Sequence, residues 1–465
     1  MKGDLPDLRE FRLEPAPSGV VHLVFDTPNR SMNVFSEAAI AEMAAFADWL
    51  ATADVAGVVV RSAKPAFCAG ADLTELGVAY DMIMAQPKAV RSEAAFSHFF
   101  RLSRALRALE TAGKPVAAAV AGLALGGGCE LVLACHHRVL IDAPQVALGL
   151  PESLVGLMQG AGGTQRLPRL IGLEAALPVL LEGARLSPAE ALRQGLTHEV
   201  VRPGDEVEAA ERWVLTAAAA RQPWDKATWK PAPTGEISGA IRQVRRRILA
   251  QTHGHYPALL AILDCLEQGL PLAMDQAIRA EMIIFSGLIQ RPEPRNMIQS
   301  LFLGRLDHDR RLKSGALAPS IEAAVQAVSA ALCAASQGAL AGGAQASKLA
   351  DALEAAGFTR PVLDTLEPAP APSQSVGLSA RGRESADLWF EHPPRSPSEV
   401  LARPFVFAAA AAAAACIDRL EPSDRRVADY AAVTRLGFPA YLGGPLALAE
   451  YLGRERIVAG GGVPA

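Results

Sequence analysis

The chain has 465 residues, of which half are apolar and 20% are charged, and its formal net charge is −4. This length exceeds what one ordinary hydrophobic core needs, so two or three packed units are expected. The small net charge and the apolar content are typical of a soluble globular protein and argue against a nucleic-acid surface.

The cysteines and the N-terminus indicate where the protein works. Six cysteines are scattered without a CxxC pair, mostly in apolar runs, and predict buried thiols in a reducing compartment. The first residues are charged and lack the apolar core of a signal peptide, so a cytoplasmic location is expected. The longest apolar stretch, Phe405 to Ile417, is short for a bilayer span and predicts a packing helix, so no membrane span is expected.

The first two hundred residues alternate between strand and helix patterns. β-branched runs of strand length recur, and segments with helical spacing separate them. Ser36 precedes one such segment and can cap it. Strand patterns cover Val20–Phe25, Gly57–Arg61, Pro115–Val120, Arg138–Ile141 and Val146–Gly149, and helical patterns cover Ser36–Leu50, Glu174–Glu182 and Pro188–Gln194. This alternation up to about Val201 places the region in the α/β class.

The rest of the chain has helical patterns. Ile237–Gln251 and Met274–Ile289 show helical periodicity, and an alanine-rich region follows Lys313. Two segments of that region carry Leu, Ile and Val at helical spacing, which favours folded helices over low-complexity disorder. These segments are Ile321–Leu332 and Leu349–Phe358, and a Pro-rich loop at Glu367–Ser373 and a polar stretch at Ala380–Ser398 follow them.

Two glycine-bearing segments suggest a ligand site, namely AFCAGADL at Ala66–Leu73 and GLALGGGCEL at Gly122–Leu131. The small residues of the first segment let a ligand approach the backbone closely. The three glycines of the second precede a predicted helix start, where unpaired amides at the positive end of the helix dipole can stabilise an oxyanion. Either segment alone is equally typical of a tight loop.

Two acidic residues lie in apolar surroundings near these segments. Glu130 lies one turn inside the predicted helix, and Glu152 lies in GLPESLVGLMQGAGGTQRLPRLIG, Gly149–Gly172. A single such acid is usually solvated or paired. Two carboxylates in apolar surroundings can have their pKa values moved apart, which yields one base and one acid. Adding water across a double bond requires such a pair.

In their order and spacing, these three segments resemble the signature segments of the crotonase (enoyl-CoA hydratase/isomerase) superfamily. The resemblance is closest to the hydratase half of the alpha subunit of the fatty-acid oxidation multienzyme complex. It implies an α/β fold, a crotonase-type spiral of ββα units followed by a mainly α-helical C-terminal half. The implied domains are a hydratase domain at 1–225, a helical linker at 226–312, and a degenerate helical domain at 313–465 resembling the C-terminal repeats of 3-hydroxyacyl-CoA dehydrogenase.

The resemblance also implies roles for individual residues. The amides of Ala71 and Gly127 would form the oxyanion hole around a thioester carbonyl, while Glu130 activates water and Glu152 delivers a proton. The implied coenzyme A contacts are Lys64, Ala69, Gly70 and Leu73. The superfamily usually has proline where this chain has Gln159, which puts rate or acyl preference in question.

The adjacent residues His136 and His137 are predicted to be structural, since neighbours on a strand point to opposite faces, and no metal site is expected.

The second half lacks one part of the alpha subunit. After Arg311 the sequence passes to helical material without a strand and glycine-rich turn, so neither an NAD site nor dehydrogenase activity is expected. The ending Asp429–Gly453, centred on GFPAYLGGP, resembles the second helical repeat of the dehydrogenase. The retained helices imply an assembly surface, with a thiolase subunit and a separate 3-hydroxyacyl-CoA dehydrogenase as candidate partners, and an oligomer.

The sequence therefore predicts a lyase that hydrates 2-enoyl-CoA thioesters in fatty-acid β-oxidation, with no cofactor beyond the coenzyme A of the substrate. Two alternatives stay open. A Δ3,Δ2-enoyl-CoA isomerase can use the same two carboxylates, and one protein can have both activities. A non-catalytic scaffold of a β-oxidation complex is the alternative from another class. Acyl chain length is not fixed by the sequence.

Overall fold

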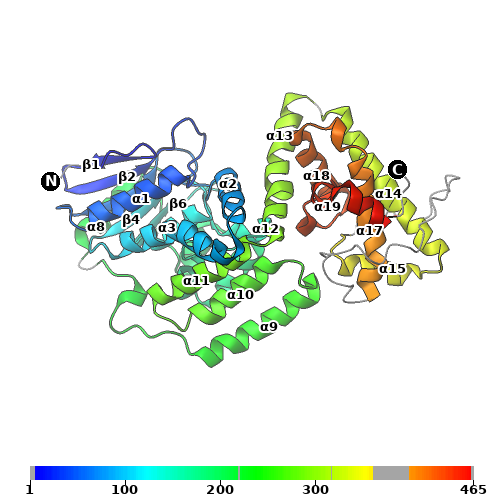
Figure 1. Ribbon diagram of the computed structural model, residues 1–465. Coiled ribbons are helices and arrows are strands. Elements are labelled where there is room, and N and C mark those ends of the chain that lie inside the picture. The colour runs from blue at the N-terminus through cyan, green and yellow to red at the C-terminus, as the bar shows by residue number, and fades with distance from the viewer. Residues whose placement is uncertain (1–5, 218–219, 316, 360–396, 462–465) are drawn as a thin grey trace. The chain divides into compact units, whose positions relative to one another are not determined.

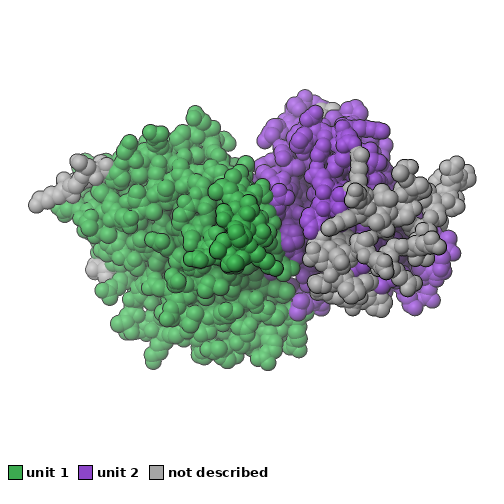
Figure 2. All heavy atoms as spheres, viewed as in Figure 1, with its two compact units in different colours: residues 1–246, 258–291 green, residues 247–257, 292–465 purple. Residues whose placement is uncertain are grey.

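The computed structural model describes residues 6–217, 220–315, 317–359 and 397–461. The chain forms two compact units, residues 1–246 with 258–291 and residues 247–257 with 292–465 (Figure 2). The predicted linker, 226–312, is therefore divided between the units, and the three functional domains remain a prediction. The predicted Pro-rich loop and the polar stretch up to residue 396 lie outside the described residues.

A six-stranded sheet with the order β1-β2-β3-β4-β6-β9 organises the first unit (Figure 1). β1 pairs antiparallel with β2, and the other neighbouring pairs are parallel. The sequence predicts β2, β3, β4 and β6 within one residue at each end, because buried parallel strands read as continuous apolar runs. The strands are β1 (Phe11–Pro15), β2 (Val20–Phe25), β3 (Gly57–Ser62), β4 (Val116–Val120), β6 (His137–Ile141) and β9 (Glu199–Val201).

Helices complete this unit. Ser36 caps α1 as predicted, since its side chain accepts a hydrogen bond from the amide of Ala39. α8 packs across β3, β4 and β6, where Ala210 and Val214 join the buried strand residues Val59 and Ala117. The helices are α1 (Glu37–Leu50), α2 (Leu73–Met84), α3 (Arg91–Thr111), α4 (Gly127–Ala134), α5 (Gly163–Ile171), α6 (Leu173–Glu182), α7 (Pro188–Arg193), α8 (Glu206–Thr216), α9 (Thr234–Thr252), α10 (Pro257–Gly269) and α11 (Met274–Ile289), with α9 and α10 crossing the unit boundary.

A three-stranded sheet places the glycine segments beside the acidic loop. β5 (Ala124–Leu125) pairs with β7 (Leu148–Gly149), which pairs with β8 (Arg185–Leu186). A bridge between Cys68 and Ala124 attaches the first glycine segment to the second. The 3-10 turn η2 (Pro151–Val155) follows β7 directly and carries Glu152. Three segments that are distant in sequence therefore meet at this sheet.

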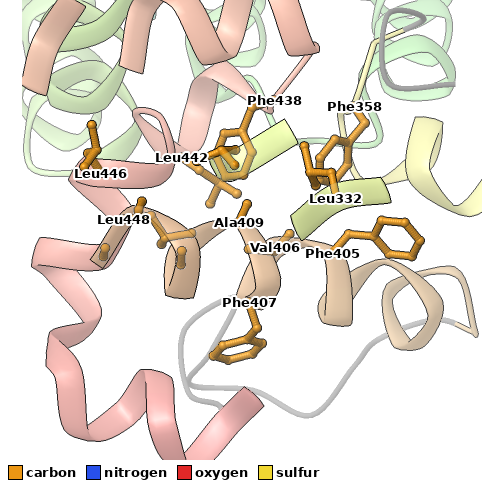
Figure 3. Close-up of a cluster of buried hydrophobic side chains, with 14 of the residues drawn as sticks. Leu332, Phe358, Phe405, Val406, Phe407, Ala409, Phe438, Leu442, Leu446 and Leu448 are labelled. Carbon is orange, nitrogen blue, oxygen red and sulfur yellow. The ribbon is translucent and has the colours of Figure 1, made fainter. Parts of the chain in front are cut away.

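The second unit is helical. Its apolar core includes Leu332, Phe405, Val406 and Phe438, each less than 5% exposed (Figure 3). The segments Ile321–Leu332 and Leu349–Phe358 of the alanine-rich region contribute side chains to this core, as predicted for folded helices. The elements are α12 (Pro292–Met297), the π-helical turn η4 (Ile298–Gly304), α13 (Arg305–Ser314), α14 (Pro319–Ala341), α15 (Ala346–Ala355), α17 (Pro397–Ala414), α18 (Pro422–Leu436) and α19 (Pro445–Gly461).

Two helical segments among the described residues, Pro319–Ala341 and Val400–Arg419, are long and apolar enough to cross a bilayer by length and composition. The apolar stretch Phe405–Ile417, which was expected to be too short for a span, lies within the longer helical segment Val400–Arg419. The prediction that this stretch forms a packing helix is confirmed, because Phe405 and Val406 belong to the apolar core. Both segments contribute side chains to the same apolar core, including Val325 from α14 and Phe405 from α17. Core helices of soluble proteins share this composition.

Candidate active site

The two glycine segments pack backbone against backbone. The amide of Leu125 donates to the carbonyl of Cys68 at 2.9 Å, and the amide of Phe67 donates to the carbonyl of Leu123 at 2.9 Å. A Cβ atom added at Gly128 would lie 2.6 Å from Cβ of Cys68, which is closer than real Cβ atoms approach. Glycine is required here because the segments could not otherwise approach so closely.

Both amides predicted to form an oxyanion hole are free. In the part of the chain that the structure describes, neither the amide of Ala71 nor that of Gly127 donates a hydrogen bond. Gly127 is the first residue of α4, where amides have no partner within the helix. A Cβ atom added at Gly70 would lie 3.6 Å from the nitrogen of Gly127, so the two segments bring these amides near each other.

Glu130 is buried, with an exposed fraction of 2%, on the first turn of α4. Its Oε1 accepts hydrogen bonds from the amides of Ala161, at 2.8 Å, and Gly163, at 2.7 Å. Burial raises the pKa of Glu130, and these two amide donors oppose the shift. The bonds occupy one oxygen of the carboxylate, so the other can take a proton.

Glu152 lies close to the same segments. A Cβ atom added at Gly126 would lie 3.0 Å from Oε1 of Glu152, so the loop before α4 leaves room for this carboxylate. Burial, and then the charge of Glu130, raise the pKa of Glu152 to about 8. Two nearby carboxylates repel each other when both are ionised, so they titrate as a coupled pair. The structure thus brings together the two acids predicted from the sequence.

Gln159, the predicted departure from the family pattern, contacts Glu152. Its side chain is fully buried, and its Nε2 donates to Oε2 of Glu152 at 3.1 Å and to the carbonyl of Leu150 at 3.2 Å. Its Oε1 is buried without a hydrogen-bond partner among the described residues. Proline could make none of these side-chain bonds.

A buried ion pair braces the loop that carries the amide donors. Arg166 forms a two-bond pair with Glu110, with both nitrogen-to-oxygen distances at 3.1 Å. Nη1 of Arg166 also donates to the carbonyl of Ala161 at 2.7 Å. The pair therefore helps to fix Ala161, one of the two residues whose amides donate to Glu130.

A third buried carboxylate, Glu281, was missed by the sequence reasoning. It comes from α11 and contacts the same loop, accepting from the amides of Gly162, at 2.7 Å, and Thr164, at 3.1 Å. Burial, and then the charge of Glu130, raise the pKa of Glu281, while the hydrogen bonds donated by Thr164 and Gly162 lower it and favour the ionised carboxylate. The apolar periodicity of α11 indicated a helix but gave no sign of which residues the helix faces.

The predicted coenzyme A residues lie around the first glycine segment. The amide of Ala69 donates to the carbonyl of Asn33 at 2.9 Å, and Leu73 begins α2. Gly70 has a φ of +101°, which glycine adopts without strain. Lys64 Nζ donates to the carbonyl of Arg30 at 2.7 Å and lies 3.2 Å from Asp26, so its charge is already paired. Their roles toward coenzyme A remain predictions.

The two adjacent histidines have separate partners. His136 lies between the amide of Val116 and the carbonyl of Glu110, at 3.2 and 3.0 Å. His137 stacks on Trp213 and lies 3.1 Å from Glu199. Within the described residues, no group of three or more His, Cys, Asp or Glu side chains is arranged to hold a metal ion.

The model of the enoyl-CoA hydratase/isomerase family matches residues 16–253, slightly more than half of the chain. The chain belongs to this family, and its first unit has the crotonase fold.

Relatives extend the match beyond the family domain. The chain is similar to the fatty acid oxidation complex subunit alpha of Shewanella amazonensis, with 31% identity over 320 residues, covering 67% of this chain and 43% of that protein. The same subunit of Shewanella frigidimarina is 33% identical over 307 residues, covering 63% and 41%. The chain thus spans less than half the length of these relatives.

Among solved structures, an enoyl-CoA hydratase from Bacillus anthracis is 24% identical, with a TM-score of 0.39, and covers 63% of this chain and 96% of that chain. An enoyl-CoA hydratase from Mycobacterium avium subsp. paratuberculosis is 20% identical, with a TM-score of 0.44, and covers 63% and 99%.

Proposed function

We propose that this protein is an enoyl-CoA hydratase, adding water across the C2=C3 bond of 2-enoyl-CoA thioesters in fatty-acid β-oxidation. The observation that carries the proposal is the pair of carboxylates, buried Glu130 and half-buried Glu152, beside the two free amides of Ala71 and Gly127. Family membership and the alpha-subunit relatives support the same reaction class.

The two amides would donate to the thioester oxygen, which gains charge as water attacks C3. Ionised Glu130 removes a proton from that water, and the hydroxyl adds to C3. Protonated Glu152 gives its proton to C2. The pair is restored when one proton returns from Glu130 to Glu152. The raised pKa of Glu152 supports its role as the acid, because the carboxyl group keeps its proton near neutral pH.

The same pair supports Δ3,Δ2-enoyl-CoA isomerase activity as a second candidate. One carboxylate would remove a proton from C4 while a carboxyl group delivers one to C2, and no water adds. No dehydrogenase activity is proposed, and no cofactor beyond the coenzyme A of the substrate.

The proposed setting is a cytoplasmic β-oxidation complex. The relatives are named as subunits of a fatty acid oxidation complex, which supports a thiolase subunit and a separate 3-hydroxyacyl-CoA dehydrogenase as partners of an oligomer. Size-exclusion chromatography with a co-encoded thiolase tests this, and separate elution of the two proteins would contradict it.

Purified protein incubated with 2-enoyl-CoA thioesters of graded chain length tests the activity. Ultraviolet absorbance of the conjugated thioester should fall as water adds, and the length profile supplies the acyl preference. A 3-enoyl-CoA substrate should instead gain absorbance if isomerisation occurs. The variant Glu130→Gln should lose hydration. A scaffold would show no turnover in either form and would keep its partners in both.

A further inference from the structure

Glu281 is fully buried in the first unit and carries a carboxylate toward residues 161–164. These residues end the loop before α5 and begin that helix, and we call them the loop at 161–164. Its Oε1 accepts the amide of Gly162 at 2.7 Å. Its Oε2 accepts both the amide of Thr164, at 3.1 Å, and the Thr164 hydroxyl. Three donors from one short loop therefore converge on a side chain that lies more than one hundred residues further along the chain.

The four successive amides of this loop alternate between two carboxylates. Ala161 and Gly163 donate to Glu130, whereas Gly162 and Thr164 donate to Glu281. The loop is thus held from both sides. Gly162 has a φ of +94°, and glycines at 160, 162 and 163 leave the backbone little intrinsic preference. The hydrogen bonds to Glu130 and Glu281 must therefore fix the conformation of this loop.

The direction of the Thr164 hydrogen bond follows from its other neighbour. Nε2 of Gln165 donates to the Thr164 hydroxyl oxygen at 2.9 Å and to the carbonyl of Cys265 at 3.0 Å. The Thr164 hydroxyl thus accepts a hydrogen from Gln165 and donates its own to Glu281. All the hydrogen bonds of Glu281 described here are therefore accepted, and the carboxylate serves as an anchor for the loop.

We propose that Glu281 is a positioning residue for hydration, holding the loop at 161–164 so that the amides of Ala161 and Gly163 stay on Glu130. This inference rests on the proposed hydratase function, in which Glu130 is the base. Glu281 acts through the loop, since both of its oxygens are occupied by loop donors. Glu281 lies beyond residue 253, where the match to the family model ends. A helix that follows the family domain therefore contributes to the proposed active site.

Steady-state kinetics of Glu281→Gln in the full chain tests this role. The glutamine keeps the shape but replaces one acceptor oxygen by a donor, so one loop amide loses its partner. We expect kcat to fall roughly tenfold or more, because small misplacements of a catalytic group have effects of that size, while KM changes less than about threefold. Ser286→Ala is the matched control, since Ser286 is buried on the same helix and donates to the carbonyl of Met282 in its own helix.

Thr164 provides a second pair of variants if the Glu281 variant folds poorly. Thr164→Val removes the hydroxyl donor at nearly constant volume, and Thr164→Ser keeps it. The valine variant should lose kcat several-fold, and the serine variant should retain it.

Hydrogen–deuterium exchange of the peptide spanning 160–165 reads loop positioning without requiring turnover. Exchange in Glu281→Gln should be faster than in the wild type by about tenfold, which corresponds to the loss of about one hydrogen bond. If the variant exchanges faster than the wild type as predicted but the wild type does not hydrate, the proposed function alone is contradicted. An active wild type whose Glu281→Gln variant keeps its kcat and its loop protection would overturn the positioning role.

Discussion

Nε2 of Gln159 lies 3.1 Å from Oε2 of Glu152, while the carboxamide oxygen of Gln159 has no hydrogen-bond partner among the described residues. Gln159, at a position where the resemblance leads us to expect proline, thus makes the one side-chain hydrogen bond described for the proposed acid. An N–H donor stabilises the ionised carboxylate and so lowers its pKa, against the effect of burial.

Replacing Gln159 by Leu should impair Glu152 in two ways. The carboxyl group loses a donor that orients it, so kcat should fall about tenfold. Its pKa should also rise, by about one unit, because the bond to the ionised form is gone. The pH dependence of kcat/KM for 2-enoyl-CoA hydration measures both effects. An unchanged rate and an unchanged alkaline limb would show that Gln159 only fills space. Gln159→Pro, which restores the usual family residue, should behave like the Leu variant.

Hydration should decline at alkaline pH. Burial and the charge of Glu130 raise the pKa of Glu152 to about 8, so below this pH the proposed acid holds its proton. Above it the proton is lost, and kcat/KM should fall by about a factor of ten per pH unit. A profile that stays flat to pH 10 in a stable protein would exclude Glu152 as the acid.

Close contact of the two glycine segments should make Gly122 irreplaceable. A Cβ atom added there would lie 1.9 Å from the carbonyl oxygen of Pro65, so Gly122→Ala must displace the backbone that leads to the predicted oxyanion hole. We expect a loss of roughly 2–3 kcal/mol in unfolding free energy, measured by denaturant titration.

Gly77→Ala is the control for that measurement. Gly77 lies inside α2, and a Cβ atom there would meet nothing within 4 Å. Alanine should stabilise this helix by about 0.5–1 kcal/mol. If both variants lowered the unfolding free energy equally, the close approach would not be the cause.

A buried side chain caps a helix in the second unit. Asp429 on α18 accepts the amides of Leu446 and Ala447, at 2.7 and 2.9 Å, in the first turn of α19. Asp429→Ala would leave both donors without this partner, so the unfolding free energy should fall by about 2–3 kcal/mol. Asp351→Ala, at an exposed position on α15, should change it by less than about 0.5 kcal/mol. Equal effects from the two substitutions would argue against a capping role.

Local patterns predicted the buried parallel strands and the long amphipathic helices. Val20–Phe25 is apolar except for His22, and the strand has those bounds. The segment Glu75–Ser103, whose sequence gives no indication of the depth of an acyl pocket, lies mostly within α2 and α3. α2 exposes large apolar residues such as Val78 and Met82, so its apolar side chains do not divide cleanly between a buried and an exposed face.

Parts of the site that depend on long-range contact could not be predicted. Glu130 and Glu152 lie within recognisable segments, so the sequence indicated both. Glu281 belongs to a helix whose packing partner is set by tertiary structure, and no short motif marks it. The contact between Gln159 and Glu152 likewise depends on how the chain turns between them, although the departure from proline already indicated an unusual site.

The most direct test of the central claim is the initial rate of absorbance loss from a 2-enoyl-CoA thioester, compared among four forms of the protein. These are the wild type, Glu130→Gln, Glu152→Gln and Glu174→Gln, the last altering an exposed carboxylate on α6. We predict that the wild type and Glu174→Gln hydrate the substrate at equal rates, while each of the other two loses at least about a hundredfold. Full activity in either Glu130→Gln or Glu152→Gln, or no activity in a folded wild type, would contradict the account.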